Sequence, residues 1–248
     1  MDLGLRGKTA IVCGASSGLG LAAAEALAEE GANVTMLARR REQLERDADR
    51  IGALAVRGDV TNVSDLERLV AKTLEAFGGI DILVWNSGGP AGGGAREMSD
   101  DALEQAFELL LAPAVRLVRL CLPQLERSGS GRIVAITSLT VQEPTPNLAL
   151  SNTIRPGLVG WLKTLSREVG PNGITVNCVA PGRIDTPRLT ELYGDGGPPP
   201  EDLGQIPLGR LGTPREFGDI VCFLASPRAA YVTGTTVLVD GGLSRSLL

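Results

Sequence analysis

The feature of this sequence that most constrains its fold is an alternation between short, continuously apolar runs and longer segments with helical periodicity. Runs that are apolar throughout, rather than at every second residue, are typical of strands buried on both faces of a parallel sheet. We therefore predict a doubly wound α/β fold in which a seven-stranded parallel sheet is flanked by helices. The predicted strands are residues 9–13, 33–38, 54–56, 80–85, 132–137, 174–179 and 236–239.

Segments with helical spacing fill the intervals between these runs. Proline suits the first turn of a helix, so we expect one helix to begin at Pro156 and to leave Ser151 in the loop before it. Pro113 is expected to kink a neighbouring helix. No linker divides the chain, which predicts a single domain over residues 1–248. The predicted helices are one that ends at Gly31, followed by residues 40–49, 63–77, 100–111, 114–127, 156–169 and 214–224.

The composition argues against several classes of function. The net charge of −5 disfavours a broad nucleic-acid interface. No stretch is long and apolar enough to span a bilayer, and the first residues have no apolar core of a secretion signal. The chain has no histidine and only four cysteines, which are far apart, so we expect no metal site. These features predict a cytoplasmic protein that binds a small molecule, with neither nucleic acid nor membrane as a partner.

A glycine-rich turn joins the first predicted strand to the first helix. Glycines let the backbone turn tightly and approach a pyrophosphate, and the N-terminus of the helix offers free N–H groups with partial positive charge. The position of the turn, between a strand and an amphipathic helix, is the context that a dinucleotide site requires. The predicted cofactor contacts in this turn are Gly14, Ser16, Ser17, Gly18, Leu19 and Gly20.

The end of the second predicted strand indicates which dinucleotide is bound. A carboxylate there would accept hydrogen bonds from an adenosine 2′-hydroxyl and would repel a 2′-phosphate. This chain has Arg39 and Arg40 at that point, and no acid before Glu42. Because arginine forms bidentate bonds to phosphate, we expect NADP(H) as the preferred cofactor, with NAD(H) as the alternative. Arg39 is predicted to be the main phosphate contact and Arg40 its helper.

Several further motifs occur in a fixed order along the whole chain. Together with the spacing of the glycine-rich turn, they resemble the short-chain dehydrogenase/reductase family, and within it the members that are similar to 3-oxoacyl-(acyl-carrier-protein) reductases. The motifs are Asp59-Val60, Asn86-Ser87-Gly88-Gly89, Ser138 at the end of the fifth strand, Pro181-Gly182 with Ile184 and Thr186, Tyr231-Val232-Thr233-Gly234, and Asp240-Gly241-Gly242.

The resemblance implies a Rossmann-type NAD(P)-binding domain that acts as an oxidoreductase on a small carbonyl or hydroxyl substrate. It also implies a homotetramer or homodimer, and a mobile substrate loop over residues 183–212. The cofactor contacts that it adds to those of the glycine-rich turn are Asp59, Val60, Asn86, Gly88, Arg155, Pro181, Gly182, Ile184 and Thr186.

The positions that carry catalysis in the family are altered here. The family uses a serine, a tyrosine, a lysine and a helical asparagine, and the matching residues in this chain are Ser138, Ser151, Arg155 and Leu110. A serine hydroxyl is far less acidic than a phenol, and a guanidinium does not carry protons. Loss of one positioned acid typically slows a reaction by about 10²- to 10⁴-fold.

Two interpretations of these changes stay open. In the first, the protein is a divergent oxidoreductase in which Ser138 polarises the carbonyl, and the proton comes from water or from another donor such as Tyr193 or Glu143. In the second, it is a catalytically silent NADP(H)-binding protein that acts as a sensor or as a partner subunit. A lyase or isomerase that uses the bound cofactor is a third possibility, although no residue singles it out.

Overall fold

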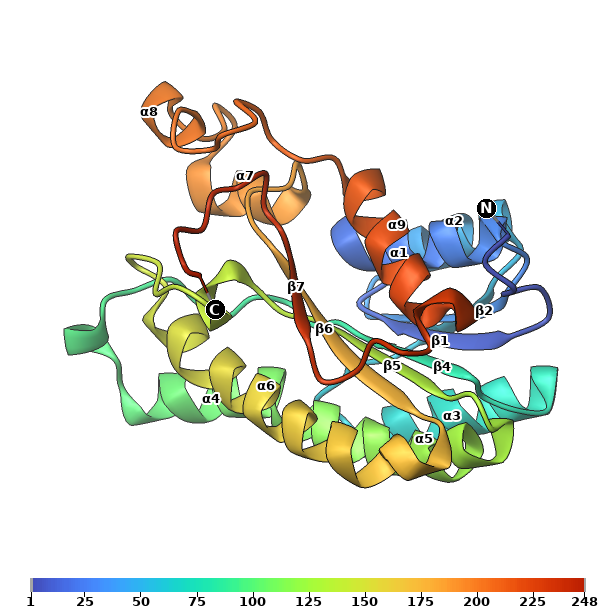
Figure 1. The fold of residues 1–248 in the computed structure, drawn as a ribbon. Helices are drawn as coiled ribbons and strands as arrows, with labels where there is room; N and C mark the ends of the chain where they lie inside the picture. The colour runs from blue at the N-terminus through green and yellow to red at the C-terminus, as the bar shows by residue number, and fades with distance from the viewer. Residues whose placement is uncertain (1, 248) are drawn as a thin grey trace.

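The seven apolar runs form a single parallel sheet, which confirms the predicted fold class (Figure 1). The structure is a computed structural model that describes residues 2–247. The strands lie in the order β3-β2-β1-β4-β5-β6-β7, so the chain starts in the middle of the sheet and winds outward in both directions. Their bounds are β1 Thr9–Cys13, β2 Asn33–Ala38, β3 Leu54–Arg57, β4 Ile82–Trp85, β5 Arg132–Ile136, β6 Thr175–Pro181 and β7 Thr236–Val239.

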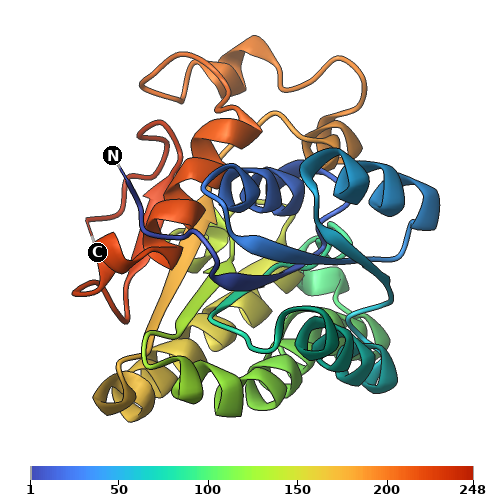
Figure 2. The same cartoon turned by 90° about the vertical axis from the view of Figure 1, so that its right-hand side faces the viewer.

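Helices cover both faces of this sheet (Figures 1 and 2). One face carries α1 (Gly18–Glu29), α2 (Arg41–Ile51) and α9 (Pro214–Ala225). The opposite face carries α3 (Val63–Phe77), α4 (Asp100–Leu110), α5 (Ala112–Ser128) and α6 (Ala149–Val169). Two short helices, α7 (Pro187–Tyr193) and α8 (Pro200–Leu203), lie beyond the carboxyl end of β6. The 3-10 turns are η1 Ala95–Glu97, η2 Leu139–Val141, η3 Gly170–Asn172 and η4 Pro227–Ala229.

Each face of the sheet has its own apolar core. Neighbouring strand residues point to opposite faces, so Val12 packs toward α1 and α9, whereas Ile11 packs toward α3 and α5. Both side chains are fully buried. Apolar residues therefore stand at neighbouring positions of the strands, because both faces of the sheet are covered. Among residues 2–247, no helix combines the length and apolarity needed to cross a bilayer.

Helix α6 corrects one prediction. It begins at Ala149, and Pro156 lies inside it, so Ser151 is on the first turn of the helix and not in a loop. A proline at this position gives up the hydrogen bond to the carbonyl of Asn152. Leu150 and Ile154 explain why the helix nevertheless extends before the proline, because both are buried against α4. Their burial stabilises the first turn by more than the lost bond costs.

One helix ends and the next begins close to Pro113. Helix α4 ends at Leu110, and α5 begins at Ala112 with the proline in its first turn, where no N–H is required. The two helices were predicted as separate segments, and Pro113 lies in the first turn of the second helix and does not kink either one. The segment 183–212, predicted as a mobile loop, contains α7 and α8.

Candidate functional site

A single cavity of about 1000 Å³ lies at the carboxyl end of the sheet, where open α/β sheets bind ligands. All but one of the residues predicted to bind cofactor or to act in catalysis line it, and the exception is Gly20. The lining residues from the predicted set are Gly14, Ser16, Ser17, Gly18, Leu19, Arg39, Arg40, Asp59, Val60, Asn86, Gly88, Ser138, Ser151, Arg155, Pro181, Gly182, Ile184 and Thr186.

Gly20 has a packing role instead. A Cβ atom at this position would lie 2.3 Å from the carbonyl oxygen of Gly14 and 2.7 Å from Nδ2 of Asn86. Real Cβ atoms do not approach backbone so closely, so only glycine lets α1 rest on the end of β1. The Asn86 amide completes this contact by donating a hydrogen bond to the Gly14 carbonyl at 3.3 Å. Gly20 therefore allows α1 to pack closely against Gly14 and Asn86, whereas Gly14 and Gly18 adopt left-handed φ angles of 59° and 55° within the turn.

The N-terminus of α1 has the features of an anion site. Its N-cap residue, Ser17, makes no side-chain capping bond, and the first turn contains no acidic residue. Helices α3, α4 and α9 differ, because Asn62, Ser99 and Thr213 each cap a backbone N–H. The uncapped N–H groups of α1 face the cavity and carry the positive end of the helix dipole. This donor set fits a pyrophosphate.

The two arginines after β2 have different surroundings, while their predicted ranking as phosphate contacts stays a prediction. Arg40 reaches back to the glycine-rich turn and donates hydrogen bonds to the hydroxyls of Ser17, at 2.8 Å, and Ser16, at 3.5 Å. Arg39 has a side chain that is 75% exposed and approaches only the carboxylate of Asp59, at 3.9 Å. Arg40 is thus the cation that is held at the phosphate end of the cavity.

Three further predicted cofactor contacts, Gly182, Ile184 and Thr186, lie on the segment that follows β6. The Gly182 N–H donates to the Val239 carbonyl at 2.9 Å, which joins the end of β6 to β7. Ile184 is buried, and Thr186 donates to its carbonyl at 3.3 Å. The methyl group of Thr186 would lie 3.4 Å from a Cβ at Gly18, so the segment after β6 rests against the glycine-rich turn. The structure therefore brings the two segments together although 168 positions separate Gly18 from Thr186.

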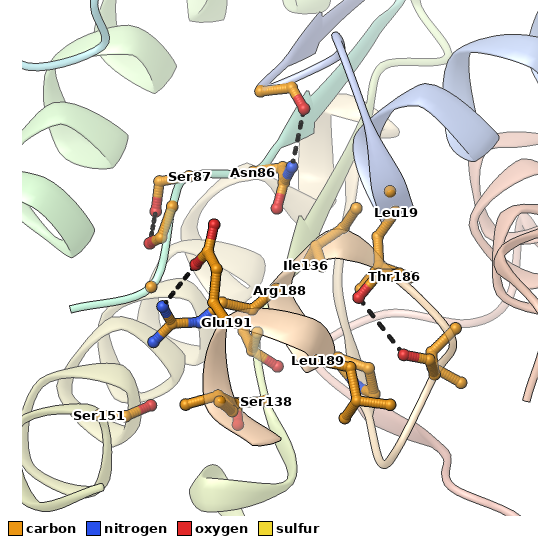
Figure 3. A pocket seen from close by; sticks show the side chains of 18 of the residues that line it. Leu19, Asn86, Ser87, Ile136, Ser138, Ser151, Thr186, Arg188, Leu189 and Glu191 are labelled. Atoms are coloured by element: carbon orange, nitrogen blue, oxygen red, sulfur yellow. Dashed lines mark hydrogen bonds and ion pairs between the residues drawn. The ribbon is translucent and has the colours of Figure 1, made fainter. Parts of the chain in front are cut away.

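Ser138 and Ser151 lie in the same part of the cavity (Figure 3). Ser138 Oγ accepts a hydrogen bond from the Thr140 N–H at 3.2 Å, and this contact leaves its hydroxyl proton available to a ligand. Ser151 is buried on α6, and its Oγ lies 3.0 Å from Oγ1 of Thr140. The two hydroxyls are thus tied to one turn, η2. Neither has a cationic or basic group bonded to it that would make it acidic.

Arg155 lies one helical turn after Ser151 and is buried. Its Nη1 donates to the Thr137 carbonyl at 3.1 Å, and its buried Nε has no hydrogen-bond partner. No carboxylate forms an ion pair with it within residues 2–247. Burial, followed by repulsion from Arg188, lowers the pKa of the Arg155 guanidinium to about 10. A bound group with hydroxyl or anionic oxygens would supply what this cation lacks.

The position of the family asparagine is apolar in this structure. Leu110 is buried against Leu150 and Ile154, and its neighbour Leu109 reaches the cavity instead. A leucine side chain neither accepts nor donates a hydrogen bond. The water relay that the resemblance implies therefore has no polar anchor at this position.

Sequence reasoning missed several lining residues or gave them little weight. Tyr193, from the end of α7, lines the cavity, and its hydroxyl accepts a bond from Arg183 Nε at 3.2 Å. Burial raises the pKa of this phenol, and the bond from Arg183 only partly offsets the effect. Glu143 accepts bonds from Ser244 Oγ at 3.3 Å and from the Arg245 N–H at 3.0 Å, which fixes the C-terminal segment beside η2.

Arg188 is the lining residue for which the sequence offered no signal. It projects from α7 and pairs with Glu191 (Figure 3), and its Nη2 donates a hydrogen bond to the Pro90 carbonyl at 2.9 Å. A Cβ at Gly89 would lie 2.7 Å from its guanidinium, so the side chain rests directly on the loop after β4. Only the folded chain places these two segments side by side. Among residues 2–247, no cluster of three or more cysteine and acidic side chains could hold a metal ion.

Comparison with known proteins identifies the family to which this chain is similar. Residues 14–244 match a family model described as enoyl-(acyl carrier protein) reductase. The chain is 37% identical over 243 residues to a 3-oxoacyl-[acyl-carrier-protein] reductase of Vibrio cholerae, covering 97% of this chain and 99% of the relative. It is 35% identical over 244 residues to dehydrogenase/reductase SDR family member 4 of Oryctolagus cuniculus, covering 96% and 94%.

Solved structures agree with these relatives. L-sorbose reductase from Gluconobacter frateurii, in complex with NADPH and L-sorbose, is similar with a TM-score of 0.93 and 33% identity, and each chain is covered completely. YwfH, an NADPH-dependent reductase involved in bacilysin biosynthesis, has a TM-score of 0.92 and 25% identity, with 97% of this chain and 99% of the other covered. The similarity thus extends over the whole fold.

Proposed function

Since the chain belongs to the short-chain dehydrogenase/reductase family, we propose that it is an NADP(H)-dependent oxidoreductase that interconverts a small carbonyl compound and the corresponding alcohol. In the reducing direction, the carbonyl compound, NADPH and one proton become the alcohol and NADP⁺. NADPH supplies the hydride when bound. The resemblance to 3-oxoacyl-(acyl-carrier-protein) reductases makes 3-oxoacyl thioesters one substrate class to test, among other small carbonyl compounds.

One observation carries this proposal. A continuous cavity joins the uncapped N-terminus of α1 to the hydroxyl of Ser138. The α1 end offers free N–H groups and Arg40 to phosphates, and the other end offers a hydroxyl proton to a carbonyl oxygen. Arg155 lies between these functions and would hold ribose hydroxyls through its free N–H groups.

Fewer side chains of this protein can donate a proton to the substrate than the family pattern implies. Ser138 would polarise the carbonyl, and Ser151 would hold a water through its buried hydroxyl beside Thr140. We assign the proton to this water, because the Tyr193 hydroxyl is already bonded to Arg183 and Asp202 and Arg155 stays charged at neutral pH. Hydride transfer depends mainly on positioning, which the cavity retains.

Binding and turnover are tested separately. Calorimetric titration should show that NADPH binds at least about 10-fold more tightly than NADH, and Arg40→Ala should remove this preference while Arg39→Ala changes it less. NADPH oxidation is then followed with 3-oxoacyl thioesters, ketones, aldehydes and sugars. A Ser151→Tyr/Arg155→Lys double variant is assayed beside the wild type.

The two outcomes separate the two candidate functions. Turnover by the wild type, at a rate that the double variant raises by about 10²-fold or more, supports the oxidoreductase. A wild type that binds NADPH but oxidises none with any substrate, beside an active double variant, supports the alternative of a catalytically silent NADP(H)-binding protein. Absence of NADPH binding would contradict both.

A further inference from the structure

We infer that Arg188 binds a carboxylate of the substrate, so that the natural substrate is an anionic carbonyl compound such as an oxo acid. This inference rests on the proposed function, because it names the class of substrate for the same cavity. It comes from the distribution of charge in the cavity and from the way in which the Arg188 side chain is held.

The cavity is basic although the chain as a whole is acidic. Its lining contains six arginines and three acids, an excess of three positive charges in a chain of net charge −5. At the phosphate end, Arg39 and Arg40 match the phosphate groups of NADP(H). The other four arginines of the lining have no cofactor phosphate assigned to them. They are Arg155, Arg183, Arg188 and Arg245.

Two of these four arginines are poorly suited to bind a substrate anion. Arg183 forms an ion pair with Asp202 at 3.4 Å and has a side chain that is only 15% exposed. Arg245 lies on the exposed C-terminal segment, which is fixed through its backbone N–H. Arg155 is buried on the cavity wall without a counter-ion, next to the sites proposed for ribose. Arg188 is therefore the accessible cation that an incoming anion meets.

Arg188 is held in place but keeps spare donors. One bond to the Pro90 carbonyl and contact with Gly89 fix the guanidinium across the mouth of the cavity. Its acidic neighbour is Glu191, three residues later on α7, at 2.9 Å, with a side chain that is 65% exposed. An exposed pair of this kind contributes only about 0.2–1 kcal/mol, so a ligand can exchange with it. The five N–H donors of a guanidinium leave a fork free for a carboxylate.

The electrostatics of the cavity favour this exchange. The charge of Arg188 is near enough to lower the pKa of Arg155, so the two cations repel each other across the site. An anion bound to Arg188 would relieve this repulsion. Neutral ketones would gain nothing from the same groups. The expected consequence is a large preference for the acid over its ester.

The test measures binding without requiring turnover. The NADP⁺-loaded protein is titrated by calorimetry with 2-oxobutanoate, 3-oxobutanoate and 4-oxopentanoate, each beside its methyl ester. We expect at least one acid to bind about 30-fold more tightly than its ester, and Arg188→Gln to weaken that acid by about 20-fold. Arg127→Gln removes the same charge from an exposed position on α5 and should leave acid binding unchanged.

Three results would overturn the inference. The first is binding of acid and ester with equal affinity, or of neither by the wild type. The second is an unchanged acid affinity in Arg188→Gln. The third is a rise of about 10-fold or more in the Kd of NADPH in that variant, which would assign Arg188 to the cofactor pyrophosphate. Selective acid binding without NADPH oxidation would leave this inference standing while the proposed function fails, and oxidation with neutral ketones alone would do the reverse.

Discussion

Asp81 and Arg155 are both charged side chains at an edge of the sheet, and the protein surrounds them differently. At the amino edge, the Asp81 carboxylate accepts bonds from the Thr9 N–H at 2.9 Å, from Ser128 Oγ at 2.6 Å and from Lys8 Nζ at 3.1 Å. At the carboxyl edge, Arg155 is more deeply buried, and its Nε has no partner. The protein supplies three partners to the first charge, whereas the Nε of the second has none among residues 2–247.

Helices α9 and α1 both begin at the carboxyl end of the sheet, and their first turns differ in a similar way. The capping box of Thr213 and Glu216 closes the start of α9, whereas Ser17 leaves the start of α1 open. Polar groups that are bonded within the protein stabilise the fold, and groups left free at the cavity bind ligands at the expense of stability. Four substitutions test this contrast, in order of expected effect.

The largest effect is expected from Arg155→Met. Burial and Arg188 lower the pKa of Arg155 to about 10, so the folded protein disfavours the charged form at neutral pH. This lowering corresponds to a penalty of at most about 3 kcal/mol, which methionine of similar length avoids. Urea unfolding without ligand should show a higher free energy of unfolding for the variant, and calorimetry should show weaker NADPH binding. Arg155→Lys is the control that keeps a cation, and a less stable methionine variant would contradict the account.

A smaller effect of opposite sign is expected from Asp81→Asn, which should lower the free energy of unfolding by about 2 kcal/mol at pH 7. Although burial opposes it, the bonds from Ser128, Thr9 and Lys8 hold the pKa of Asp81 below its ordinary value. The stabilisation is therefore complete above the ordinary carboxyl pKa, about 4, and is lost as the pH falls through the lowered folded pKa.

Urea unfolding of Asp81→Asn between pH 7 and pH 2 follows this loss directly. The difference in stability between the variant and the wild type should shrink as the pH falls. Asp195→Asn, in an exposed loop, is the matched control and should stay within about 0.5 kcal/mol of the wild type at every pH. A difference that does not depend on pH would show that the Asp81 charge is not what stabilises this edge.

The smallest effects are expected at the helix caps. Thr213→Ala removes a capping bond and should lower the free energy of unfolding by about 1 kcal/mol. Ser17→Ala removes no capping bond and should change it by less than about 0.5 kcal/mol. Thermal unfolding compares the two variants. NADPH titration should show a loss of affinity for Ser17→Ala alone, because its hydroxyl holds Arg40 and faces the cavity. Equal destabilisation by both variants would remove the contrast between the helices.

Much of the fold was predictable because its signals are local. Each of the predicted strands is present within about two residues of its expected bounds, since a strand covered on both faces must be apolar along its length. The start of α6 was wrong for an equally physical reason. Pro156 locally favours the start of a helix. The packing of Leu150 and Ile154 against α4 depends on tertiary structure, and it outweighs the preference of the proline.

The sequence by itself determined the order of strands and helices, the glycine-rich turn, and the replacement of the family tyrosine and lysine by Ser151 and Arg155. Only the tertiary structure decided that Arg40 is bonded to Ser17, that Arg155 is buried without a counter-ion among residues 2–247, and that Arg188 reaches Pro90. Periodicity and turn chemistry act between near neighbours along the chain. The charge and shape of a cavity depend on side chains that packing brings together from distant segments, and no local pattern records them.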